Sequence, residues 1–177
     1  MISSNSRTEV ASERQRSTER GFRPIAGPGG QGRSRAVAGA VAAGAGGRRE
    51  HDRWLVWHLT RVQDSHIAEL LDAEQVYLSG DWAPKFGLKP SPSDTGYGYS
   101  AAQVAAVAPE SWQALTGYYE AVHAQTMAYL DGLSGDDLDR VVDEDWDPPV
   151  TLGVRLVSVW NDDTQHVGQA AYVRGLL

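Results

Sequence analysis

The chain has 177 residues and no cysteine, which excludes disulfides, cysteine-ligated zinc, iron–sulfur clusters and a cysteine nucleophile. Its net charge of −7 is unevenly placed: residues 1–50 carry nine Arg and four Glu, whereas residues 51–177 carry 7 basic and 19 acidic side chains. The acidic body argues against nucleic acid as a partner, and no window holds the roughly 18 apolar residues of a membrane span, so we expect a cytoplasmic protein.

Residues 1–50 differ in kind from the rest of the chain. They are rich in Arg, Ser and Gly, and Phe22 is their only aromatic residue. Their large apolar residues recur at no regular period, so this stretch offers little surface to bury. We interpret it as a low-complexity, disordered segment, followed by a helical domain at residues 51–177.

The helical pattern begins abruptly near residue 54 and continues to about residue 73. Leu55, Leu59, Val62 and Leu70 recur at the spacing of one helix face. His58 lies on or beside this apolar stripe, where a histidine is more often a hydrogen-bonded core residue than a metal ligand. His66, among polar neighbours, is interpreted as a surface residue.

The next stretch, residues 75–99, contains too many Gly and Pro residues for a long helix but is rich in aromatic residues. These aromatics could anchor a loop on the domain or contact a substrate. Ser100 and Gln103 form a capping-box pattern that opens a short helix. A longer helix is predicted at residues 110–133, with Pro109 in its first turn.

The last predicted helix follows Thr151, a suitable N-cap residue. Leu156, Trp160 and Val167 indicate its buried face, which continues through the Ala-rich end of the helix. The preceding residues 143–147, in which Asp alternates with Trp, are interpreted as an extended loop without calcium-site spacing.

Two residues on this last helix have the spacing of a chelating pair. Asp162 and His166 are four apart, so they lie one turn above each other with Cβ atoms about 5–6 Å apart. With His58 as third ligand, they could hold one divalent ion and leave an open position. The alternative is an ordinary solvated helix face, since this short motif also arises by chance. An aspartate near a buried face favours the metal, because an unpaired buried carboxylate is costly.

Two stretches resemble the metal-bearing helices of the DinB-like superfamily: WLVWHLTRVQD at residues 54–64 and DDTQHVGQ at residues 162–169. The resemblance covers residues 54–177 and implies an all-α, DinB-like four-helix bundle. It also implies that His58 and His166 are imidazole ligands and that Asp162 stands where the family has His or Glu. Gln169 would support a ligand or line a pocket.

The same resemblance implies a metal-dependent enzyme, a transferase, isomerase or hydrolase in which the ion activates a thiolate or water. Zn²⁺ is the expected metal, with Ni²⁺, Fe²⁺ or Mn²⁺ as alternatives. Mycothiol is an expected thiol, because the superfamily includes mycothiol-dependent transferases and a mycothiol-dependent maleylpyruvate isomerase. The competing interpretation is a non-catalytic metal-binding or structural bundle that forms a homodimer.

The resemblance predicts an amphipathic first helix before residue 54, which residues 1–53 do not supply. One hypothesis is that this segment is a mistranslated first helix, read from a shifted frame or a wrong start. Translation of the other two frames of the gene tests it, because one of them should then encode an amphipathic helix that ends in a short polar turn.

Overall fold

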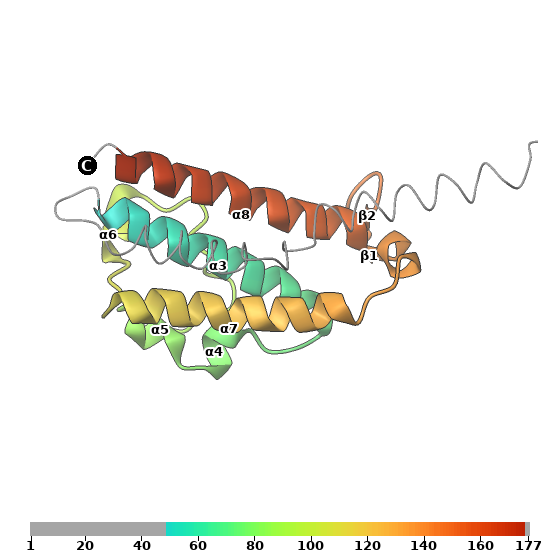
Figure 1. The fold of residues 1–177 in the computed structure, drawn as a ribbon, viewed down its shortest axis with the longest axis horizontal. Coiled ribbons are helices and arrows are strands. Elements are labelled where there is room, and N and C mark those ends of the chain that lie inside the picture. The colour runs from blue at the N-terminus through green and yellow to red at the C-terminus, as the bar shows by residue number, and fades with distance from the viewer. Residues whose placement is uncertain (1–48, 176–177) are drawn as a thin grey trace, which may run out of the picture.

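The computed structural model describes residues 49–175. Three long helices dominate this part: α3 (Arg49–Leu71), α7 (Trp112–Asp131) and α8 (Leu152–Gly175). α3 packs against both other helices, and α8 runs in the opposite direction to it (Figure 1). The all-α fold expected from the sequence is confirmed. Of the segment predicted at residues 1–50, only Arg49 and Glu50 are described, and they belong to α3, which begins before the predicted start near residue 54. Residues 1–48, and with them the hypothesis of a mistranslated first helix, lie outside the described residues.

The structure also contains two short strands that were not predicted from the sequence. β1 (Val141–Asp143) pairs antiparallel with β2 (Val150–Thr151), on either side of the loop that contains Trp146. A run this short carries too few alternating residues to show a strand period. The pair leads the chain directly into α8, after the short 3₁₀ helix η1 (Asp136–Asp139).

The main core lies between α3, α7 and the connection that joins them. Val56 and Trp57 from α3 meet Tyr118 from α7 there, and Tyr77 and Phe86 from the connection complete the cluster. The connection holds three short helices, α4 (Val76–Ser79), α5 (Trp82–Lys85) and α6 (Ala101–Ala106). Of the two roles considered for the aromatic residues of this connection, Tyr77 and Phe86 therefore have the first: they anchor it on the domain.

Local capping explains where the helices begin. The capping box of Ser100 and Gln103 is present at α6, as predicted. α7 starts two residues later than predicted, because the Ser111 hydroxyl accepts the Ala114 backbone N–H and makes Ser111 the N-cap. Thr151 has the same role at α8, where its hydroxyl accepts the N–H of Val154 at 3.4 Å.

The buried stripe of α8 is narrower than the sequence indicated. Leu156 and Ala170 are buried as expected, but Trp160 is 39% exposed, Val167 is 37% exposed and Ala171 is exposed too, so these three predictions were wrong. Among the described elements, α8 packs mainly against α3, and η1 and the two strands also contact it, so much of the helix is covered on one side only. No helix in the described part of the chain is both long and apolar enough to cross a membrane.

A polar cluster fastens α3 to α8 and to β1. Arg155, 8% exposed, donates to Glu69 at 3.0 Å and to Asp143 at 2.9 Å. Its Nη1 also lies 3.2 Å from Nδ1 of His66, a pair in which only the imidazole can accept. The interpretation of His66 as a surface residue was wrong, because Arg155 and α8 cover it.

Acidification should weaken the fold through His66. Burial and the neighbouring Arg155 lower the pKa of His66 below its ordinary value of 6.5. The unfolded chain therefore binds the proton first, so this contribution to stability is complete above about pH 6.5 and is lost as pH falls through the folded pKa. We expect the free energy of unfolding to decrease on acidification in urea titrations.

The His66→Gln variant provides the comparison, since a glutamine oxygen can still accept from Arg155 but does not titrate. Its pH dependence should be shallower than that of the wild type, although not flat, because burial also lowers the pKa of His58. Identical slopes in the two proteins would contradict this assignment.

Candidate metal centre

The three residues singled out in the sequence come together between α3 and α8. One potential ligand atom from each of His58, Asp162 and His166 lies within 4.8 Å of the other two. Nε2 of His166 is 3.5 Å from Oδ1 of Asp162, one turn away on the same helix. The two imidazole rings meet edge to face, with centroids 4.7 Å apart. These three residues are called the triad below.

The backbone fixes the His58 ring with one nitrogen directed away from its support. His58 is 5% exposed, and its Nδ1 lies 2.6 Å from the carbonyl oxygen of Thr95. A carbonyl can only accept, so Nδ1 carries the proton and Nε2 keeps its lone pair in the neutral ring. Burial lowers the pKa of His58, which favours that neutral form. A deprotonated Nε2 is the form that binds a metal ion.

His166 is held in a similar way from its own helix. Its Nδ1 lies 2.8 Å from Oε1 of Gln169, so Gln169 contacts the ring that the resemblance predicts it to support. Such hydrogen bonds to the second ring nitrogen orient histidines that bind metals. Both histidines therefore direct Nε2 away from a supporting oxygen.

Asp162 supplies the remaining sign that the triad suits a cation. Its Oδ2 is buried and has no hydrogen-bond partner among the described residues. A buried carboxylate oxygen without a partner is costly unless a positive charge compensates it. Two imidazoles and a carboxylate are ligands that Zn²⁺ commonly takes, with one position left open. Ligand atoms of a tetrahedral site lie about 3.4 Å apart for bonds of about 2.1 Å, so the triad, with atoms up to 4.8 Å apart, is slightly open.

Comparison with known proteins gives the family of the chain. The profile of the mycothiol-S-transferase family matches residues 49–177. The chain belongs to the mycothiol-S-transferase family. This is a DinB-like family, so the resemblance seen in the sequence is confirmed.

A solved structure supports the same fold for this family member. The crystal structure of a conserved protein from Enterococcus faecalis is 29% identical to it, with a TM-score of 0.70. The similarity covers 94% of each chain. No curated protein matches the sequence.

An aromatic neighbour of the triad was not singled out in the sequence. Trp54 stacks on His58 with ring centroids 4.9 Å apart and an angle of 5° between the planes. Its ring also meets His166 edge-on, at 6.5 Å. The position of Trp54, four residues before His58, indicated a shared helix face, but only the packed structure shows which face turns toward α8.

A buried arginine holds the loop that supports His58. Arg61 is fully buried and donates to the carbonyl oxygens of Ser91, Pro92 and Asp94, at 3.1 to 3.3 Å. Its guanidinium also lies 3.4 Å from Oδ2 of Asp64. Because Thr95 follows Asp94 directly, Arg61 fixes the position of the carbonyl that accepts from His58. An arginine within an apolar stripe was the only hint of this role in the sequence.

Gly96 lets this loop approach the aromatic residues of α3. Its φ is +86°, and a Cβ at this position would lie 2.6 Å from Trp57 and 3.0 Å from Trp54. Gly98 has a similar φ of +72°, but a Cβ there would meet no atom within 4 Å. The two glycines thus separate the effect of backbone conformation from that of crowding.

We expect Gly96→Ala to destabilise the protein by about 2–4 kcal/mol, through strain at positive φ and overpacking against the indoles. Gly98→Ala has the backbone strain alone and should lower stability by about 1 kcal/mol. Urea denaturation of both variants measures the difference. Equal losses would show that the loop can move away from α3 without further loss of stability.

Proposed function

We propose that the protein is a metal-dependent enzyme that uses a low-molecular-weight thiol, in a transfer or isomerisation reaction, with His58, Asp162 and His166 as the metal ligands. The observation that carries this proposal is the triad, in which one ligand atom from each residue lies within 4.8 Å of the other two and Oδ2 of Asp162 is buried without a partner among the described residues. Membership of the mycothiol-S-transferase family supports a thiol as substrate. Since the chain has no cysteine, a thiol must come from a small molecule.

The residues around the triad have separate parts in this chemistry. A divalent ion held there acts as a Lewis acid that lowers the pKa of a thiol or of water. Thr95 and Gln169 keep the two imidazoles in the tautomer that exposes Nε2. Trp54 covers one face of His58 and excludes water from it. Zn²⁺ is the ion that we propose, on the basis of the ligand types.

A thiol-consumption assay tests the proposal. Mycothiol is mixed with monobromobimane, an alkylating probe, and the rate is compared for the protein as purified, after chelation, and after Zn²⁺ is restored. We expect the protein as purified to consume the thiol faster than a control without protein. Chelation should abolish this acceleration, and added Zn²⁺ should restore it. Parallel assays with Ni²⁺, Fe²⁺ and Mn²⁺ compare the alternative ions.

The alternative is a non-catalytic metal-binding or structural bundle. The slightly open spacing of the triad and the short Asp162 side chain, where the superfamily has His or Glu, favour this alternative. Full metal occupancy without any acceleration would support it and contradict the enzyme. The homodimer and the cytoplasmic location expected from the sequence stay predictions.

A further inference from the structure

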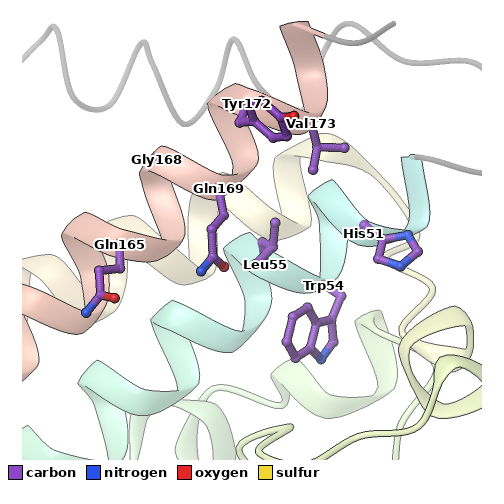
Figure 2. Close-up of a pocket in the computed structure, with 8 residues that line it drawn as sticks. All are labelled: His51, Trp54, Leu55, Gln165, Gly168, Gln169, Tyr172 and Val173. Atoms are coloured by element: carbon purple, nitrogen blue, oxygen red, sulfur yellow. The ribbon is translucent and has the colours of Figure 1, made fainter.

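A pocket lies next to the triad, between the first turns of α3 and the last turns of α8. Its volume is about 550 Å³. Figure 2 shows Trp54 and Leu55 from α3 around the same space as Gly168, Tyr172 and Val173 from α8. The remaining lining residues are His51, Gln165 and Gln169. The pocket with all of these lining residues is called the groove below.

The lining of the groove is mostly apolar and aromatic. Leu55 is 5% exposed and forms its floor, while Tyr172 is 69% exposed and stands at its edge. None of the described lining residues is a carboxylate, a lysine or an arginine. A lining of this kind suits an uncharged, flat apolar group, because the transfer of such a group out of water and its contact with aromatic faces both lower the free energy.

Two residues belong to both the groove and the surroundings of the triad. The Trp54 indole stacks on the His58 ring, and Oε1 of Gln169 accepts a hydrogen bond from Nδ1 of His166. Each lies about one helical turn from its histidine, a rise of about 5.4 Å along the axis. A ring joined to a reactive atom through one carbon spans about this distance, so one small molecule can occupy the groove and reach the triad.

We propose that the groove binds the flat apolar group, preferably aromatic, of the electrophilic small molecule that accepts the thiol. This inference rests on the proposed function. The thiol carrier itself fits the groove less well if it is a polyol such as mycothiol, because the apolar walls offer few partners for its hydroxyl groups. The groove thus sets the specificity for the acceptor.

Cobalt substitution allows the groove to be tested by binding alone. The full chain is loaded with Co²⁺, and thiol binding is followed through the sulfur-to-cobalt charge-transfer absorption. Benzyl mercaptan, whose ring can enter the groove, is compared with 2-mercaptoethanol, which has no ring. We expect benzyl mercaptan to bind at least ~tenfold more tightly, the effect expected when part of a phenyl ring leaves water.

Gly168 provides a variant that fills the groove. A Cβ on Gly168 would meet no atom of the described residues within 4 Å, so Gly168→Phe adds a ring on α8 where these residues leave space. This variant should lose the preference for benzyl mercaptan and keep its binding of 2-mercaptoethanol. Ala171→Phe adds the same ring at an exposed position that does not line the groove, and should behave as the wild type. Tyr172→Ala, which removes one wall, should reduce the preference without a change in fold.

The outcomes separate this inference from the proposed function. Equal binding of the two thiols by the wild type, or an unchanged preference in Gly168→Phe, would overturn the groove assignment and leave the metal-thiol chemistry intact. No cobalt uptake, or no absorption band with either thiol, would overturn the proposed function, and the groove assignment with it.

Discussion

Replacement of His166 by alanine should lower the affinity for Zn²⁺ by at least ~100-fold, since even residues that only support a metal ligand contribute about 10- to 100-fold. The variant loses one imidazole and leaves Asp162 to face His58 alone. Elemental mass spectrometry on untagged protein should show about one ion per chain in the wild type and none in the variant, and competition with a chelating dye should give the affinities.

The control is His123→Ala, which removes a histidine on α7, outside the triad. It should bind Zn²⁺ as the wild type does. The side chain of His166 is 17% exposed, so circular dichroism is needed to show that His166→Ala keeps its helix content. A folded His166→Ala protein with undiminished zinc would remove the triad as the metal site and move the assignment to the non-catalytic bundle.

Replacement of Arg61 by methionine should have the largest effect on stability, about 3–5 kcal/mol. The change leaves the Asp64 carboxylate buried without its charged partner, and such broken buried pairs are strongly destabilising. It also removes the donor to three carbonyl oxygens in the loop before Thr95. Asp64 retains the backbone N–H of Tyr77 and the Tyr118 hydroxyl, which limits the loss. Urea denaturation measures this difference.

Arg140→Met is the matched control, because Arg140 is exposed and its side chain donates only to the Tyr129 hydroxyl among the bonds described. This substitution should change the free energy of unfolding by no more than about 0.5 kcal/mol. Arg61→Lys keeps the positive charge but has fewer hydrogen-bond donors than the guanidinium. This variant should fold, but the Thr95 carbonyl should be less well ordered, and Zn²⁺ should therefore bind more weakly. A small loss of stability in Arg61→Met would show that the loop is held by other contacts.

The geometry of the triad explains why its residues could be found without a structure. Asp162 and His166 are neighbours because any α-helix brings positions four apart onto one face. His58 was a candidate from its place beside an apolar stripe, and the family resemblance strengthened that choice, since its helix is separated from α8 by two connections and a further helix. Trp54 and Gln169 were harder to place, because their roles depend on the rotation of each helix about its own axis.

The errors also have physical causes. Trp160 and Val167 were assigned to a buried face because they are large and apolar, but burial depends on which neighbours cover a helix, and the described part of α8 packs mainly against α3. His66 was assigned to the surface from polar neighbours in the sequence, while Arg155, which covers it, comes from 89 residues further along the chain. Local composition does not contain such contacts.

The sequence by itself determined the helical class, the starts of α6 and α8, and the neighbouring positions of Asp162 and His166 on the last helix. These features depend on periodicity, capping and spacing, which act within about one turn of the chain. Tertiary structure alone decided the tautomer of His58, the clamp formed by Arg61, and the groove beside Trp54. Each of these requires side chains from distant segments to meet, and that meeting is set by the packing of α3 against α8 and the loop at residues 91–96.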